Sequence, residues 1–310
     1  MPAGGRTRPP RLRPGDRVAV VAPGGPVDPV RLDAGCAVLR GFGLDITTGP
    51  HVRDRTGFLA GRDADRAADL QAAWCDPSVR AVVCARGGYG SMRLLDRLDW
   101  DALAAAGAKL LHGASDVTAL HVAFGARLGL ATTFGPMAAL APIGSAEPEP
   151  GSLACLRDTL FAPGRTQVLA APTPRALAGG RAFGLLDGGN LSLLASLAGT
   201  PYAPPAAPGR IVLLEDINEE PYRVDRMITQ LLLAGWFDGV TGVILGSWVG
   251  CGSPEEVEEV LAERLLQLNV PVLAGLPIGH GVPQLTLPLG VAAELDADAG
   301  TIALHEPALS

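Results

Sequence analysis

Short apolar runs alternate with segments of helical spacing between residues 17 and 134. The apolar runs, rich in valine, leucine and alanine, are 17–22, 79–85, 109–112 and 131–134. The segments with helical spacing are 29–39, 64–74, 91–98 and 116–128. Before the first helical segment, Asp28 and Pro29 are typical of an N-cap followed by proline at the first helical position. Strands that alternate with helices in this way predict a parallel sheet with helical crossovers.

Prolines interrupt this pattern between residues 142 and 174. They stand at Pro142, Pro148, Pro150, Pro163, Pro172 and Pro174, and they leave room for only a short helix at 153–160. Beyond them the pattern predicts helices at 191–197, 222–234 and 255–268, strands at 211–214 and 240–245, and short β runs near Val272, Val291 and Ile302. We therefore expect an N-terminal α/β domain at residues 1–145, a linker at 146–174 and a C-terminal α/β domain at 175–310.

The composition is that of a folded protein with sizeable cores. Hydrophobic residues make up 48% of the 310 residues and charged residues 18%, which argues against disorder. The net charge of −7 and the lack of a basic cluster in the body of the chain give no indication of a nucleic-acid partner. The arginines near the start are expected on a frayed, solvated terminus: Arg6, Arg8, Arg11 and Arg13.

The five cysteines are scattered: Cys36, Cys75, Cys84, Cys155 and Cys251. The chain has no C-x-x-C or H-E-x-x-H spacing, so we expect no metal ion and no other cofactor. An odd, dispersed set of cysteines fits a reducing compartment. Because there is no signal-peptide core and no run of about 20 apolar residues, we expect a cytoplasmic protein with no membrane partner.

Two turns at strand ends can carry chemistry. In the segment Gly113–Leu120, Ser115 lies where a strand turns into a helix, which is typical of an exposed nucleophile on a strained turn. The alternative is that Ser115 or Asp116 only caps the helix. In the segment Arg86–Ser91, glycines allow close approach of the backbone to a ligand, with Arg86 and Tyr89 nearby. The alternative there is a tight turn that binds nothing.

Two further residues complete a candidate site. Glu215 follows the apolar strand 211–214, where a fixed carboxylate can orient an imidazole. The alternative is an acid that complements a helix dipole. His280 lies between two glycines on a loop, whereas His51, His112, His121 and His305 lack that setting. A surface or structural role for His280 is the alternative.

These motifs, taken in order, resemble the LD-carboxypeptidase family of serine peptidases, which trim murein tetrapeptides and include the microcin C resistance peptidases. The matching segments cover nearly the whole chain: 14–16, 20–23, 58–61, 66–70, 86–90, 93–95, 113–120, 188–194, 214–216, 222–226 and 277–281. The chain differs from the family at Phe134, where members often carry histidine, and at Ala114, where a bulkier residue is common. The difference at Phe134 bears on the wall of the cleft, and both differences concern the details of the substrate more than the chemistry.

The resemblance implies a triad of Ser115, Glu215 and His280, with backbone N–H groups of Gly88 and Asp116 as oxyanion donors. It also implies an α/β fold: an N-terminal three-layer domain with a parallel sheet, which carries the serine, and a second, smaller α/β domain, which carries the other two residues. The site would then lie between the domains.

The resemblance further implies a small peptide substrate, a murein tetrapeptide that is cleaved before its terminal D-alanine. The carboxylate of the terminal D-alanine needs a cationic or N–H partner. Arg86, Tyr89 and Arg223 are the candidates for substrate binding. Members of the family often form homodimers, so a homodimer is also expected.

Three other functions remain open. One is hydrolysis of a peptidyl or aminoacyl nucleotide, as in microcin resistance. The second is a non-catalytic binder of small molecules that uses the glycine turns as anion sites. The third is a degenerate family member that acts only as a binding or scaffold protein.

Overall fold

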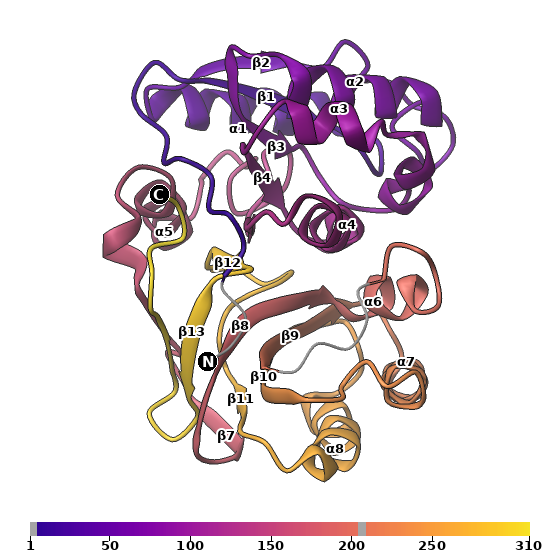
Figure 1. Ribbon diagram of the computed structural model, residues 1–310, viewed down its shortest axis with the longest axis vertical. Helices are drawn as coiled ribbons and strands as arrows, with labels where there is room; N and C mark the ends of the chain where they lie inside the picture. Colours follow the sequence, from indigo (N-terminus) through magenta and orange to yellow (C-terminus); the bar gives the residue numbers. More distant parts are fainter. Residues whose placement is uncertain (1–4, 204–208) are drawn as a thin grey trace.

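The computed structural model describes residues 5–203 and 209–310, which form two β-sheets with helices around them (Figure 1). The helices of these residues are α1 Pro29–Gly41, α2 Asp63–Cys75, α3 Trp100–Ala105, α4 Thr118–Leu128, α5 Pro150–Phe161, α6 Leu191–Leu197, α7 Pro221–Leu233 and α8 Pro254–Leu265. Short 3-10 helices are η1 Ser91–Arg97, η2 Ser115–Val117, η3 Pro163–Thr166 and η4 Leu266–Leu268. The first sheet lies above the second in Figure 1, with α4 between them.

The first sheet has six strands in the order β12-β5-β4-β3-β1-β2. Their bounds are β1 Arg17–Val21, β2 Asp45–Thr48, β3 Val79–Cys84, β4 Leu110–Gly113, β5 Thr132–Phe134 and β12 Leu287–Leu289. The strands β1 to β5 are parallel, as the sequence pattern predicts, and β12 from the far end of the chain is antiparallel to β5. The pattern did not predict β2, where Ile46 alone is buried.

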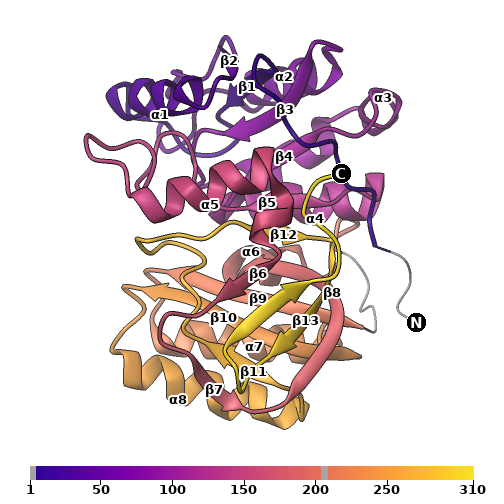
Figure 2. The ribbon, with the colours of Figure 1, turned by 90° about the vertical axis from the view of Figure 1, so that its left-hand side faces the viewer.

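Alternation along β1 shows why helices cover both faces of this sheet. Val18 and Val20 belong to one hydrophobic cluster, together with residues of α1 and α5. Ala19 and Val21 belong to the other cluster, together with residues of α2 and α4. Since successive side chains of a strand point to opposite faces, the sheet is buried on both sides and this half of the molecule has three layers. Figure 2 shows α1 and α5 near each other in the same part of the molecule.

The second sheet has eight strands in the order β6-β14-β13-β8-β9-β10-β11-β7. Their bounds are β6 Val168–Ala170, β7 Arg175–Ala178, β8 Arg181–Asn190, β9 Arg210–Ile217, β10 Val240–Val249, β11 Val272–Ala274, β13 Ala292–Asp296 and β14 Thr301–Leu304. The strands β8 to β11 are parallel, and antiparallel strands flank them. Apolar residues of α6, α7 and α8 pack in one cluster with this sheet.

Two expectations about single strands need correction. The pattern missed β8, because Asp187 and three glycines interrupt its apolar residues, and Gly188 and Gly189 have φ of 101° and 141°. Glu215 does not follow a strand that ends at residue 214. It lies inside β9, where it pairs with Asn190 of β8, and the strand extends to Ile217 because its last residues pair with β10.

Residues 146–174, which we expected to be a linker, contain regular structure. Leu156 and Leu160 of α5 are buried in the cluster that covers the first sheet, and β6 pairs with β14 in the second. The segment therefore packs against both halves. The exact division into domains remains a prediction.

The arginines near the N-terminus are not all solvated, contrary to our expectation. The guanidinium of Arg6 donates to the buried carboxylate of Asp187 at 3.1 Å and also lies against Gly125 of α4. The N-terminal segment thus links α4 with β8. None of the helices within the described ranges combines the length and the apolar character needed to span a membrane.

Replacing Gly35 should destabilise the fold. A Cβ atom at Gly35, in the buried face of α1, would overlap the backbone carbonyl of Ala138. Because backbone cannot move aside cheaply, we expect Gly35→Ala to lower the free energy of unfolding by about 1–3 kcal/mol. Urea unfolding measures the change. Gly41→Ala is the matched control in the same helix, since no atom of the described residues, beyond its chain neighbours and its own helix backbone, lies within 4 Å of its added Cβ. Equal stability of the two variants would contradict the packing described here.

Candidate active site

Ser115 stands on a strained turn between β4 and α4. Ala114 is extended, Ser115 has φ of 62°, and the 3-10 turn η2 leads directly into α4. A left-handed conformation costs a residue other than glycine on the order of 1–3 kcal/mol and often marks a functional site. Neither Ser115 nor Asp116 caps its own helix, so the capping alternative is wrong. The turn instead presents the serine hydroxyl to the second half of the chain.

The hydroxyl of Ser115 meets His280, which lies 165 residues away in the sequence. Ser115 Oγ is 2.9 Å from His280 Nε2, and His280 Nδ1 is 2.6 Å from Glu215 Oε2. With Nδ1–H donating to the carboxylate, Nε2 is free to accept the serine proton. The structure therefore brings together all three residues of the predicted triad, from the first sheet, the second sheet and a loop.

Glycine and serine hold the His280 loop in place. The backbone N–H of His280 donates to Ser247 Oγ at 2.7 Å. Gly279 has φ of 119°, and a Cβ there would lie 2.5 Å from both Glu215 Oε2 and Ser247 Oγ. Only glycine fits this approach of the loop to the carboxylate. Ser247 was not singled out from the sequence, because no local motif distinguishes it.

The two carboxylates at the end of β9 share one donor. Glu215 is fully buried, and its Oε1 accepts from Asn190 Nδ2 at 3.2 Å. The same Nδ2 donates to Asp216 Oδ1 at 2.9 Å. Burial raises the pKa of Asp216 to about 6, against the effect of the bond from the Ile217 N–H and with the help of the Glu215 charge. Asn190 is therefore part of the site, although the sequence motif did not assign it a role.

The pKa of His280 lies above its ordinary value. Burial by itself lowers this pKa, but the hydrogen bond and the charge of Glu215, together with the charge of Asp216, raise it. An imidazole with such a partner is a stronger base, and its protonated form is stabilised next to the buried carboxylate.

The glycine turn at residues 87–90 packs directly against Ser115. A Cβ added to Gly87 would lie 2.7 Å from Ser115 Cβ and 3.1 Å from the backbone nitrogen of Asp116. Gly88 has φ of 97°. The two predicted oxyanion donors, the N–H groups of Gly88 and Asp116, thus belong to segments in contact around the serine. Their role as donors remains a prediction.

The side chain of Asp116 ties this turn to the serine. Its buried carboxylate accepts from the N–H groups of Gly90 at 3.2 Å and Ser91 at 2.8 Å. Burial raises the pKa of Asp116, although these bonds act in the opposite direction. The residue after Ser115 therefore fixes the position of the neighbouring glycine turn.

The three predicted substrate-binding residues have different environments. Arg86 is partly buried, its Nη1 donates to the Pro26 carbonyl at 2.9 Å, and no carboxylate of the described residues pairs with it. Burial lowers the pKa of Arg86. Tyr89 is 54% exposed and its ring contacts Phe58. Arg223 is exposed and ion-paired with Glu219 at 3.6 Å, so it is the weakest of the three candidates.

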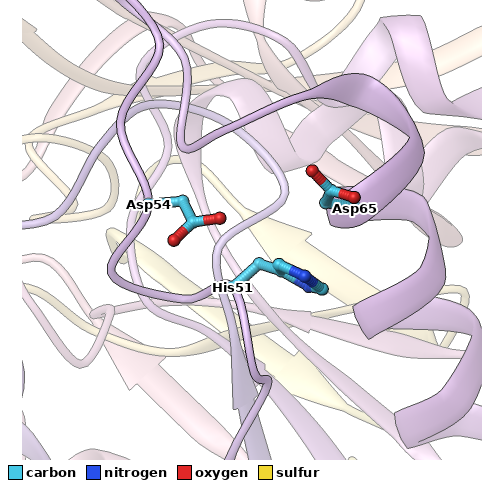
Figure 3. A group of neighbouring side chains, drawn as sticks. All are labelled: His51, Asp54 and Asp65. Carbon is cyan, nitrogen blue, oxygen red and sulfur yellow. The ribbon is translucent and has the colours of Figure 1, made fainter.

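The other histidines lie apart from the triad. Burial lowers the pKa of His112 and of His121 to about 4, so both are neutral packing residues. His51, Asp54 and Asp65 place possible metal-ligand atoms within 4.8 Å of one another (Figure 3). Both Asp65 oxygens accept from Arg62, and His51 Nδ1 bonds to Asp69. Two of the three side chains, His51 and Asp65, thus already have partners, and we assign no ion to the group.

Comparisons with known proteins agree with the motifs. Residues 18–135 match the model of the LD-carboxypeptidase N-terminal domain, and residues 183–295 match that of the LD-carboxypeptidase C-terminal domain. A protein of Streptomyces coelicolor named "putative carboxypeptidase" is 56% identical over 307 residues, with 97% of each chain covered. The murein tetrapeptide carboxypeptidase of Pseudomonas aeruginosa is 35% identical over 294 residues, which cover 91% of this chain and 94% of that protein.

A solved structure shares the whole fold. The structure of MccF in complex with glutamyl sulfamoyl guanosine aligns with a TM-score of 0.89 at 26% identity, and the alignment covers 98% of this chain and 99% of that one. MccF is the microcin C7 self-immunity protein of Escherichia coli.

The contact between Gly87 and Ser115 predicts the effect of a single added methyl group. We expect Gly87→Ala to slow covalent labelling of Ser115 by a fluorophosphonate on the order of 10²-fold, since a shift of about 1 Å at a nucleophile has such effects. Mass spectrometry of the labelled peptide measures the rate. Gly164→Ala is the control and should react like the unchanged protein, because within the described part of the chain only its own neighbours lie within 4 Å of its added Cβ. Unchanged labelling of Gly87→Ala would contradict the contact.

Proposed function

Because the chain belongs to the LD-carboxypeptidase family, we propose that it is a serine carboxypeptidase that removes the terminal D-alanine of murein tetrapeptides. One observation carries this proposal: hydrogen bonds of 2.6 and 2.9 Å connect Glu215, His280 and Ser115 without a break. The relative named murein tetrapeptide carboxypeptidase supports the substrate class.

In the first step Ser115 Oγ attacks the carbonyl carbon of the amide bond before D-alanine. His280 Nε2 takes the hydroxyl proton as the new C–O bond forms. The resulting imidazolium is stabilised by Glu215, which remains ionised. Because Oγ and Nε2 are already 2.9 Å apart, no further movement of these two groups is required for proton transfer.

The carbonyl oxygen becomes negatively charged in this step. It would lie near the N–H groups of Gly88, in the glycine turn, and of Asp116, in η2. There the N-terminus of the helix that follows also favours negative charge. The Asp116 carboxylate keeps the glycine turn against the serine through Gly90 and Ser91. The turn that carries Gly88 is therefore held in position before substrate binds.

In the second step the C–N bond breaks and His280 gives its proton to the amine of D-alanine. The shortened peptide stays bound to Ser115 as an ester. A water molecule, deprotonated by His280, then attacks the ester and releases the peptide and the free serine. No cofactor takes part in this sequence of proton transfers.

Arg86 is the residue best suited to bind the terminal carboxylate of the substrate. It lies beside the glycine turns, because Cβ atoms added to Gly25 and Gly88 would each be 3.5 Å from its guanidinium nitrogens. It has no carboxylate partner within the described residues. A partly buried guanidinium that has no carboxylate partner of its own binds a substrate carboxylate strongly.

Hydrolysis of an aminoacyl nucleotide is the second candidate function. The similarity to MccF bound to glutamyl sulfamoyl guanosine favours it. The same Ser115, His280 and Glu215 chemistry would cleave such a substrate. The homodimer that the resemblance implies stays a prediction, as does the domain division.

Synthetic tetrapeptides test the substrate. We expect cleavage when the last residue is D-alanine, no cleavage with L-alanine, and a higher KM when the terminal carboxylate is replaced by an amide, because Arg86 loses its partner. Lysine and diaminopimelate at the third position are compared in parallel, with an aminoacyl sulfamoyl nucleoside as the alternative substrate.

Ser115→Ala should lower kcat by several orders of magnitude. Wild-type turnover by Ser115→Ala would refute the assignment.

The pKa of His280 determines the acidic limb of the pH–rate profile. Only neutral His280 can accept the serine proton, so kcat/KM should rise with pH through a raised pKa, above about 6.5. Glu215→Gln removes the group that raises this pKa and should lower kcat by roughly 10⁴-fold. Glu219→Gln, in the same segment but paired with Arg223, is the control. An acidic limb centred below pH ~6 would contradict the proposed pairing.

A further inference from the structure

Asn190, in the motif Gly188-Gly189-Asn190, takes no part in the reaction described above. Asn190 is the last residue of β8 and is 2% exposed. Its side-chain oxygen accepts from Ser192 Oγ at 2.7 Å and from the Leu193 N–H at 3.3 Å, which makes it the N-cap of α6. This fixes the orientation of the amide, so that the NH₂ group faces the two carboxylates of β9.

The NH₂ group is a donor to both acids at the end of β9. It bonds to Glu215 Oε1 at 3.2 Å and to Asp216 Oδ1 at 2.9 Å. Glu215 is fully buried and uses its other oxygen for His280. A buried carboxylate without a donor on its free oxygen is costly. The NH₂ group of Asn190 therefore sets the orientation of the carboxylate that holds the imidazole.

The backbone of the same residue reaches the other half of the molecule. The N–H of Asn190 donates to Thr118 Oγ1 at 3.0 Å. Thr118 is the first residue of α4, three positions after Ser115. A Cβ on Gly189 would lie 2.7 Å from Thr118 Oγ1, so glycine permits this approach. Hydrogen bonds from one residue thus reach both the helix that follows the nucleophile and the acid that orients its base.

We propose that Asn190 is a positioning residue, which aligns Ser115 with His280 by bonding to Thr118 through its backbone and to Glu215 through its side chain. This role depends on the proposed function, because it has a purpose only if Ser115 transfers its proton to His280. Neither bond touches substrate. Loss of either should therefore affect kcat far more than KM.

Side-chain variants separate positioning from helix capping. Asn190→Asp keeps the size and the N-cap oxygen, and aspartate is as good a cap as asparagine. It replaces the shared donor by a third acid facing Glu215 and Asp216. We expect kcat to fall at least about 10-fold, with KM changed less than about twofold. An unchanged kcat would mean that Asn190 only caps α6, and would overturn the proposal.

Variants of Thr118 test the second bond without altering Asn190. Thr118→Val removes the hydroxyl at nearly constant volume and should lower kcat about as much as Asn190→Asp does. Thr118→Ser keeps the hydroxyl and should have the kcat of the unchanged protein. Ser196→Ala is the matched control, since the hydroxyl of this exposed serine of α6 bonds, among the described residues, only to the Ser192 carbonyl. Circular dichroism and the thermal midpoint show whether each variant is folded. Equal kcat of Thr118→Val and Thr118→Ser would overturn the proposal.

Rates of Ser115 labelling by a fluorophosphonate distinguish failure of the two proposals. If the unchanged protein cleaves no tetrapeptide but is labelled, the murein substrate is wrong, and slower labelling of Asn190→Asp and Thr118→Val still supports the positioning role. If the unchanged protein cleaves the tetrapeptide and both variants keep its kcat and labelling rate, the substrate stands and the positioning role is wrong.

Discussion

The site can react only if one hydrogen bond forms between residues from two distant parts of the chain. Ser115 Oγ and His280 Nε2 are 2.9 Å apart, although 165 residues separate them and they belong to different parts of the fold. A side-chain contact of this kind is lost with a relative shift of about 1 Å. The surrounding structure must therefore fix the two halves against each other as tightly as a core is packed.

Close approaches at glycines and buried polar bonds provide this rigidity. Gly87 lets one turn contact the serine, and Gly279 lets the histidine loop contact Glu215. Between the halves, Arg6 reaches the buried Asp187 of β8, while Asn190 reaches Thr118. Each of these polar groups is costly to bury without its partner. The bonds are consequently specific: they stabilise one alignment of the halves and disfavour others.

Local motifs located the candidate site better than they predicted the architecture. Neighbouring residues indicated Ser115, Glu215 and His280 only as separate candidates, and the family resemblance joined them into a triad. The argument that placed Glu215 just beyond a strand was wrong, because it lies inside β9. The strand β8 was not predicted, since its glycines obscure the apolar pattern. Its pairing with β9 and β13 makes it a strand. The roles of Arg6 and Asn190 depend on residues far away in the sequence, so no local pattern could indicate them.

The most direct measurement of the central claim is a crystal structure of the protein after reaction with a fluorophosphonate. We expect the phosphorus atom bonded to Ser115 Oγ, a phosphoryl oxygen within hydrogen-bonding distance of the N–H groups of Gly88 and Asp116, and His280 still bonded to Glu215. An adduct on another residue, or a phosphoryl oxygen directed away from both N–H groups with His280 displaced, would contradict the account.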